Sequence, residues 1–338
     1  MIVKSLALRL GGALLTVLLA SWVAFVILRI LPGDPVRLIL GPLASSRALL
    51  AERAALGLNQ PIYVQYLTYV GDFVRGNWGF DYNSGQPILA EVTARLPASL
   101  ELGFYALLLA FVGAVVTAVT AVHFEWKGPD YFFRAGAYFS LGSPPFWVGL
   151  MTLIVFVQYL GVLPGPTGRL SNGVPPPPTI THFYTFDAIL SGQWATFVDA
   201  ARHLLLPAAT LGLASYGYLY RLLRNSLLQV VDEEFMAVCR SKGLTRWQTM
   251  IRHALPNSLL PAVTGGGLLV AQLVAGSVLV ETVFNWPGVG QLVVQSILVR
   301  EYGVVEAFVL LSALAFVAVN LVVDALYVLI DPRVRRPA

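Results

Sequence analysis

A long polar stretch lies between two apolar runs, from Asp232 to Pro261, and reads DEEFMAVCRSKGLTRWQTMIRHALPNSLLP. Three consecutive acids open it, and Arg240 and Lys242 follow a short apolar segment, which is the charge order that a helix dipole favours. Gly243 comes next, where a helix C-terminus favours a residue in the left-handed conformation. The pattern therefore predicts a short helix that ends at this glycine.

A second short helix is predicted immediately after the glycine. Thr245 and Gln248 have the spacing of a capping box. Four apolar residues then follow at positions i, i+3, i+4 and i+7, beside basic residues, and form one face: Trp247, Met250, Ile251 and Ala254. Such a face needs a surface that buries it. Either a groove on a partner protein or the headgroups of a bilayer could bury this face.

An acid inside an apolar run is costly and usually faces a cavity or a partner. We single out three such acids, Glu101, Glu281 and Asp324. A transporter driven by an ion gradient would use such groups as a relay. However, the three lie at different depths without a lysine in the same runs, so we favour a structural role, such as hydrogen bonding between helices.

Other catalytic chemistry has little support in the sequence. The three lysines follow Val3, Trp126 and Ser241, so no Gly-Lys pair and no phosphate-binding P-loop occurs. The four histidines are scattered, and the single cysteine, Cys239, has no partner for a disulfide or a metal site. We therefore expect a protein that is not an enzyme and that has no metal or cofactor of its own.

The composition defines the setting of these residues. Hydrophobic residues make up 57% of the 338 residues and charged residues only 12%, whereas soluble domains carry about 25% charged residues. This composition predicts an integral membrane protein and excludes soluble enzyme folds. The net charge of +4 is spread along the chain without a basic tract, so nucleic acid is not the expected partner.

Six apolar runs are long enough to cross a bilayer, which needs about 20 residues per helix. They are Leu10–Leu31, Ser99–His123, Tyr138–Val162, Leu204–Arg224, Asn257–Val283 and Val304–Ile330. Because the runs are unbroken rather than alternating, they predict helices and not barrel strands. Six helices place both termini on one side. Pro144-Pro145 and Gly265–Gly267 inside these runs permit close packing or local unwinding.

The distribution of basic residues predicts the orientation. The side of the termini carries Lys4, Arg9, Lys127, Arg134, Arg221, Arg224, Arg240, Lys242, Arg246, Arg252, Arg333, Arg335 and Arg336, against Arg169, Arg202 and Arg300 in the short loops opposite. The positive-inside bias then places both termini in the cytoplasm. The long segment from Pro32 to Ala98 faces outward, and the helical periodicity around Leu49–Leu56 predicts a small folded cap there.

Several motifs carry a family resemblance. The run Gly243–Pro256 resembles the cytoplasmic coupling loop of ABC importer permeases, although Ala237, Val238 and Cys239 stand where the general pattern has Glu-Ala-Ala. The rest of the sequence resembles the branch of these permeases that serves dipeptides, oligopeptides and nickel. The motifs that carry this resemblance are LPGDP at Leu31–Pro35, ALGLNQP at Ala55–Pro61, RLPASLELG at Arg95–Gly103, SPPFWVGL at Ser143–Leu150, ETVFNWPGVG at Glu281–Gly290 and NLVVDALYVLIDPRVR at Asn320–Arg335. These motifs run nearly from end to end.

The resemblance implies an all-α, six-helix type I importer permease of the MetI-like fold. It divides the chain into a first helix with its outer cap (1–94), a permease core (95–330) with a coupling loop (232–256), and a cytoplasmic tail (331–338). The residues expected to couple to an ATPase are Glu234, Ala237, Cys239, Arg240, Lys242, Gly243, Leu244, Trp247, Met250, Ile251, Leu255 and Pro256.

The resemblance also implies the partners. It predicts a multi-pass subunit of a bacterial inner membrane that forms half of a pathway for peptides or similar solutes. A second homologous permease, two ATPase subunits that bind ATP and Mg²⁺, and an extracytoplasmic substrate-binding protein would complete the importer. Two other classes are an ion-gradient transporter that works without ATPases, which has no need for the loop 237–252, and a membrane receptor or structural module.

Overall fold

The computed structural model describes residues 2–30, 36, 40–41 and 43–330, although the side chains of 2–10, of 323–330 and of several residues between 264 and 276 are not described. The LPGDP motif and the tail 331–338 therefore lie outside the described residues. Asp324 lies on a described helix, but its side chain does not belong to the described set.

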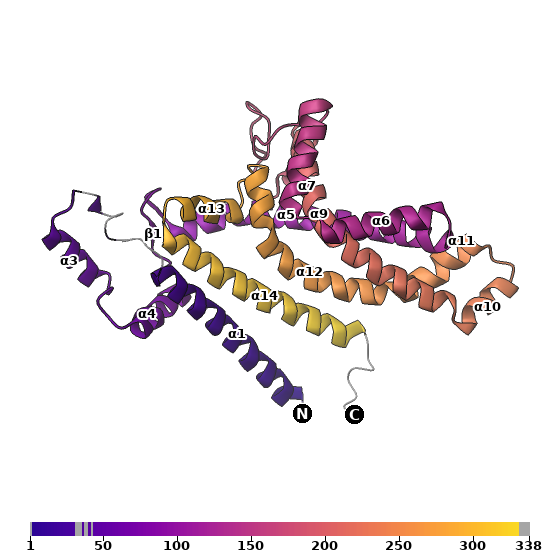
Figure 1. The fold of residues 1–338 in the computed structure, drawn as a ribbon, viewed down its shortest axis with the longest axis horizontal. Coiled ribbons are helices and arrows are strands. Elements are labelled where there is room, and N and C mark those ends of the chain that lie inside the picture. Colours follow the sequence, from indigo (N-terminus) through magenta and orange to yellow (C-terminus); the bar gives the residue numbers. More distant parts are fainter. Residues whose placement is uncertain (1, 31–35, 37–39, 42, 331–338) are drawn as a thin grey trace. The chain divides into compact units, whose positions relative to one another are not determined.

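The described chain is almost entirely helical (Figure 1). Its elements are α1 (Ile2–Ile30), α3 (Ser46–Ala55), α4 (Ile62–Val74), β1 (Phe80–Asp81), β2 (Gln86–Pro87), α5 (Ile88–His123), α6 (Gly128–Gly142), α7 (Pro145–Thr152), the π-helix η1 (Leu153–Tyr159), α8 (Tyr184–Leu190), α9 (Trp194–Val231), α10 (Glu234–Ser241), α11 (Arg246–Thr249), the π-helix η2 (Met250–Ala254), α12 (Leu255–Val283), α13 (Val289–Leu298) and α14 (Tyr302–Ile330). This confirms the predicted helical fold class.

Three of the described helices are long and apolar enough to cross a bilayer by themselves, in the segments Gly11–Ile30, Ile88–His123 and Tyr302–Val322. They contain most of the first, second and sixth predicted spans. The fourth and fifth predicted spans lie within the long helices α9 and α12. The total of six membrane crossings stays a prediction.

The third predicted span, Tyr138–Val162, is not one helix. The chain ends α6 at Gly142 and starts α7 at Pro145, and the pair bends by 113° at this break. Ser143 and Pro144 adopt extended backbone conformations. The cause lies in the sequence, because a proline disfavours a helical conformation in the residue before it and Pro144-Pro145 applies this restriction twice.

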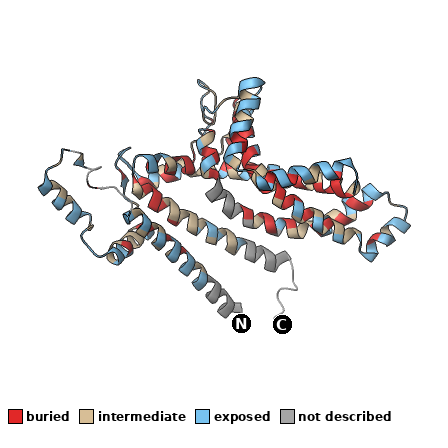
Figure 2. Ribbon diagram, viewed as in Figure 1, coloured by how far each residue is buried: buried red, intermediate tan, exposed pale blue. Residues whose placement is uncertain are grey.

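The chain divides into two compact units. Unit 1 comprises residues 1–97 and 288–318. Its core joins apolar side chains from α1, α4, the start of α5, α13 and α14, including Val17, Phe73, Ile88 and Val304. The predicted outer cap contains α3, α4 and a β1–β2 hairpin, but α3 has no buried residue. Between residues 11 and 30, helix α1 exposes more side chains than it buries (Figure 2), as a helix in lipid would.

Unit 2 comprises residues 98–287 and 319–338. Helix α9 packs against α6, α7, α8 and α12 and carries many of the buried side chains in Figure 2. Small residues make the closest approaches possible. A Cβ atom on Gly217 would lie 2.5 Å from the carbonyl oxygen of Ala137 on α6, and one on Gly212 would lie 2.6 Å from that of Ala106 on α5. The predicted coupling loop (232–256) therefore follows directly from a closely packed helix, α9.

Candidate coupling site

The turn between the two predicted docking helices has the predicted geometry. Gly243 has φ +82°, the left-handed conformation that only glycine adopts without strain, and its N–H donates to the carbonyl oxygen of Arg240 (3.0 Å). The capping box is complete, since Thr245 Oγ1 accepts from the Gln248 N–H (3.2 Å) and Gln248 Oε1 accepts from the Thr245 N–H (3.1 Å). Two caps therefore fix the direction in which the chain reverses.

The second docking helix differs from the prediction. Helix α11 begins at Arg246 and has four residues, and it passes at Met250 into the π-helix η2, which continues into α12. A π-helix has more residues per turn than an α-helix, because its hydrogen bonds join residues five apart. The expected single apolar face is therefore divided. Met250 and Ala254 are buried in the core of unit 2, whereas Trp247 and Ile251 remain exposed.

Contacts at both ends attach the segment to unit 2. Met236 of α10 and Met250 of η2 enter the same apolar cluster as Leu223 and Leu227 of α9. On α11, the Arg246 guanidinium donates to the carbonyl oxygen of Val122 at the end of α5 (3.1 Å). The segment is thus in contact with α5 and α9 and continues directly into α12.

The Trp247 ring adds a further contact to α5. It meets the His123 ring edge to face, with 5.2 Å between the ring centroids, and still leaves 47% of Trp247 exposed. One side of this aromatic residue therefore rests on unit 2, and the other faces outward.

The exposed side of the segment combines apolar and basic groups. Phe235, Val238, Trp247 and Ile251 are large apolar side chains that are 38–53% exposed. Of the predicted coupling residues, Glu234, Ala237, Arg240, Lys242, Gly243 and Pro256 are also exposed, Cys239, Leu244 and Leu255 are half-buried, and Met250 is buried. We call the four apolar residues together with Arg240 and Lys242 the docking face.

A buried ion group lies beneath this region, and the sequence analysis did not identify it. The Asp130 carboxylate, at the start of α6, is fully buried and accepts two hydrogen bonds from the Arg224 guanidinium of α9 (3.1 and 3.2 Å). Arg134 lies 3.4 Å from the same carboxylate, and the Trp126 N–H donates to it at 3.2 Å. This group joins α6 to α9. Asp130 and Arg224 are 94 positions apart in the sequence, so no local sequence pattern predicts that they pair.

The acid Glu101 has a partner of its own. Its carboxylate, 1% exposed, accepts hydrogen bonds from the Thr185 N–H (2.9 Å) and hydroxyl (2.6 Å), and it forms an ion pair with Arg169 from the loop before α8. The Arg169 guanidinium also lies over the Tyr184 ring, 3.4 Å from its centroid. A carboxylate held in this way ties a loop to α5. This arrangement supports the structural role over an ion relay.

The other two predicted intramembrane acids are placed differently. Glu281 lies near the end of α12 and is completely buried. Asp324 lies on α14, with its side chain outside the described set. Among the described residues, no group of three His, Cys, Asp or Glu side chains could hold a metal ion.

Long apolar helices and a capped, partly exposed segment between α9 and α12 are the features of a helical membrane protein. Comparison with protein families gives the class: the chain belongs to the family of inner membrane components of binding-protein-dependent transport systems, whose model matches residues 110–336, and the N-terminal model of the same family matches residues 2–103. It is thus a transport permease of ABC importers.

Individual relatives cover nearly the whole chain. It is 39% identical over 328 residues to a probable D,D-dipeptide transport system permease protein of Escherichia coli strain K12, a match that covers 97% of this chain and 96% of the relative. A dipeptide transport system permease protein of the same strain is 35% identical over 334 residues (97% of each chain). A glutathione transport system permease protein of that strain is 33% identical over 327 residues (97% of each chain).

Proposed function

We propose that this permease forms half of the translocation pathway of an ATP-driven importer for small peptides, and that residues 232–256 transmit the movement of an ATPase subunit to it. A second homologous permease would supply the other half. Two ATPase subunits would bind ATP and Mg²⁺, and a substrate-binding protein would deliver the peptide from outside. Both termini would lie in the cytoplasm.

The docking face is the observation that carries this proposal. An exposed apolar surface flanked by basic groups is suited to a groove with acidic rims on a soluble partner. The contacts of Met236, Met250 and Arg246 with the core of unit 2 then give a route from that groove to the long helices. A transporter without ATPase subunits would need neither feature.

The substrate class is inferred from the relatives. Those compared above are named for D,D-dipeptides, dipeptides and glutathione, all of which contain amide-linked amino acids. Small peptides are therefore the substrate class that we propose. The outer segment 32–98 is the proposed contact for the substrate-binding protein, and its deletion is expected to abolish uptake but to leave ATPase docking intact.

Two charge insertions on the docking face test the proposal. Val238 is 53% and Ile251 38% exposed, so Val238→Asp and Ile251→Asp leave the interior of unit 2 unchanged. Full burial of one such side chain contributes about 1.5–3 kcal/mol, so burying the exposed 38–53% contributes roughly 0.6–1.6 kcal/mol. This corresponds to about a threefold to fifteenfold loss of affinity for the ATPase subunits. Binding to purified ATPase subunits and peptide-stimulated ATP hydrolysis are the measurements.

Leu190→Asp is the matched control, because Leu190 is 62% exposed and lies on α8, away from the docking face in the chain. This variant should bind the ATPase subunits like the unchanged permease. If both docking-face variants also bind normally, the segment is not the docking site. Peptide uptake that persists without ATPase subunits would instead favour ion-gradient coupling.

A further inference from the structure

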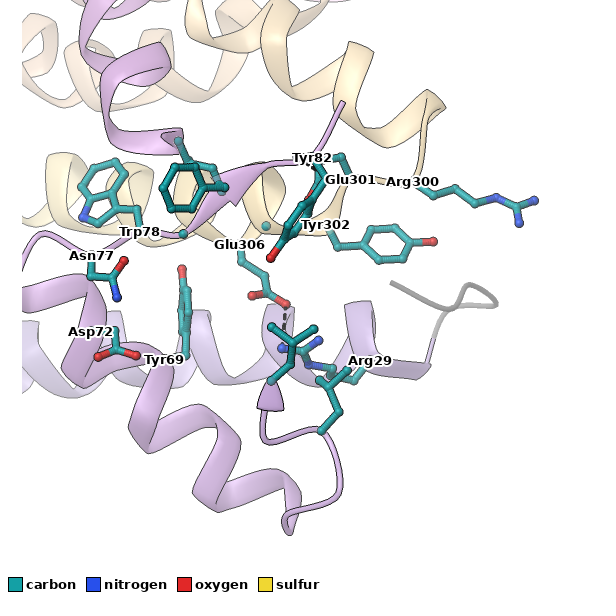
Figure 3. Close-up of a pocket in the computed structure, with 16 residues that line it drawn as sticks. Arg29, Tyr69, Asp72, Asn77, Trp78, Tyr82, Arg300, Glu301, Tyr302 and Glu306 are labelled. Atoms are coloured by element: carbon teal, nitrogen blue, oxygen red, sulfur yellow. Dashed lines mark hydrogen bonds and ion pairs between the residues drawn. The ribbon is translucent and has the colours of Figure 1, made fainter. Parts of the chain in front are cut away.

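Unit 1 contains a cavity of about 270 Å³ that the coupling mechanism does not use (Figure 3). Its walls come from the end of α1, from α4, from the segment 77–82 and from the junction of α13 and α14. Aromatic side chains form much of the lining, including Tyr69, Trp78 and Tyr82. Trp78 is fixed in place, because its ring stacks on Phe73 (4.3 Å between centroids) and its indole N–H donates to the Phe73 carbonyl oxygen (3.1 Å).

The charged groups around the cavity do not balance. Glu301 and Glu306 are each only 8% exposed. Arg29 pairs with Glu306 at 3.7 Å, whereas the Glu301 carboxylate accepts a hydrogen bond from the Tyr82 N–H (3.4 Å) and forms no ion pair with any described residue. Arg300 is exposed, and its side chain points away from the other labelled residues in Figure 3. Among the described residues, the Glu301 carboxylate is thus left without a cationic partner.

One further group at this place, the buried Tyr69 hydroxyl, also lacks a hydrogen-bond partner among the described residues. Figure 3 shows the Tyr82 hydroxyl directed toward Glu306. Burial, and then the nearby Asp81 charge, raise the pKa of Glu301 above its ordinary value, although hydrogen bonds from the Tyr82 and Gly303 N–H groups act in the opposite direction. A cation in the cavity would offset this desolvation and give the Tyr69 oxygen a donor.

We propose that this cavity binds the primary ammonium group at the N-terminus of a small peptide. An ammonium has three N–H donors and no acceptor, and Glu301 and Tyr69 both line this cavity with oxygens that can accept such hydrogen bonds. The aromatic rings of Trp78 and Tyr82 supply faces that attract a cation. A metal ion fits less well, because no described group of three ligating side chains exists.

The inference rests on the proposed function, since peptide import supplies the ligand, and it deepens that function by naming the group that is recognised. Pockets that enclose drug-sized ligands have volumes of about 300–1,000 Å³. A cavity of about 270 Å³ therefore suits one end of a peptide and leaves the remainder outside. The headgroup of phosphatidylethanolamine carries the same ammonium chemistry and is the source that the experiment must separate from a peptide.

Binding to the full-length permease in nanodiscs tests the proposal without ATP or transport. Isothermal titration with Ala-Ala is compared with N-acetyl-Ala-Ala, which lacks the ammonium. The variants are Glu301→Gln, which removes the unpaired charge, and Tyr69→Phe, which removes one hydroxyl whose loss leaves no described partner unsatisfied. Glu125→Gln, a carboxylate outside the cavity, is the control. Thermal unfolding of each variant establishes that it is folded. Nanodiscs of phosphatidylglycerol alone are compared with nanodiscs that contain phosphatidylethanolamine.

We expect the acetylated peptide and Glu301→Gln to weaken binding at least tenfold, Tyr69→Phe to weaken it severalfold, and Glu125→Gln to change nothing. Equal binding of the two peptides, absence of binding, or normal binding by both variants in folded protein would overturn the proposal. Binding that phosphatidylethanolamine suppresses would assign the cavity to the lipid headgroup instead.

The two proposals fail separately. Normal docking-dependent uptake in a permease that binds no ammonium would overturn only the ammonium site. Ammonium binding in a permease that binds no ATPase subunit would overturn only the proposed coupling.

Discussion

The buried Asp130 group offers the sharpest energetic test of how unit 2 holds the coupling segment. Asp130→Ala removes a fully buried carboxylate and leaves Arg224 (12% exposed) and Arg134 (24% exposed) without it. Arg224→Ala removes two hydrogen bonds but leaves Arg134 and the Trp126 N–H on the same carboxylate. The loss of Asp130 should therefore destabilise the protein more than the loss of either arginine.

The magnitude follows from the chemistry of buried ion pairs. Removing one partner of such a pair typically costs about 3–5 kcal/mol, and Asp130→Ala should fall in this range. Because a second arginine remains at 3.4 Å, Arg224→Ala should cost less, about 1–3 kcal/mol, the value for hydrogen bonds to a charged group. Arg134→Ala should cost about 1 kcal/mol or less, since its longer, partly exposed contact resembles a surface pair.

The assay is a double-mutant cycle on Asp130 and Arg224, with free energies of unfolding measured by reversible denaturation in detergent micelles. The double variant should be less destabilised than the sum of the two single variants, by about 1–3 kcal/mol, since interacting residues show coupling energies of this size. Additive effects, or a cost of Arg134→Ala as large as that of Asp130→Ala, would refute the assignment of this group as the link between α6 and α9.

Three further predictions concern glycines and one carboxylate. Gly217→Ala places a Cβ atom 2.5 Å from the Ala137 carbonyl oxygen and should lower the free energy of unfolding by at least about 1–3 kcal/mol. Gly113→Ala is the control, since its Cβ atom would meet only the Tyr216 ring, at 3.6 Å. Equal stability of the two variants would contradict the close contact between α6 and α9 at Gly217. Gly243→Ala, at φ +82°, should cost about 1–2 kcal/mol and weaken ATPase binding, whereas Gly243→Asn should be milder because asparagine tolerates this conformation. Burial raises the pKa of Glu301, so the Glu301 carboxyl holds its proton more strongly in the folded protein than in the unfolded protein. The contribution of Glu301 to stability therefore falls as the pH rises from the ordinary pKa of 4.5. In denaturation curves between weakly acidic and neutral pH, Glu301→Gln should gain stability relative to the unchanged protein as the pH rises, and a constant difference between the two proteins would contradict the assignment.

Local signals in the sequence predicted the turn of the coupling segment well. The cap residues Gly243, Thr245 and Gln248 act within a few positions of one another, so their spacing specifies the geometry. The prediction of a single exposed apolar face was correct for Trp247 and Ile251 but wrong for Met250 and Ala254, which are buried. The periodicity changes from α- to π-helical at Met250, which packs against α9, and a pattern with a fixed period of 3.6 residues cannot show this change.

Contacts between residues far apart in the sequence could not be predicted from local patterns. Glu101 was recognised as unusual because it lies in an apolar run, but its partner Arg169 is 68 positions away, in a loop that was used only to assess orientation. Asp130 gave no such signal, because it lies at the start of α6 beside other polar residues. The cavity of unit 1 is likewise assembled from four separated segments and has no motif of its own.

The central claim is that residues 232–256 bind an ATPase subunit in the cytoplasm, and Cys239, half-buried on α10 and the single cysteine of the chain, tests it directly. A membrane-impermeant maleimide is applied to right-side-out and inside-out vesicles, with and without the ATPase subunits. The account predicts labelling only in inside-out vesicles, and suppression of that labelling by the ATPase subunits. Labelling from outside would contradict the topology, and cytoplasmic labelling that ignores the ATPase subunits would contradict the docking.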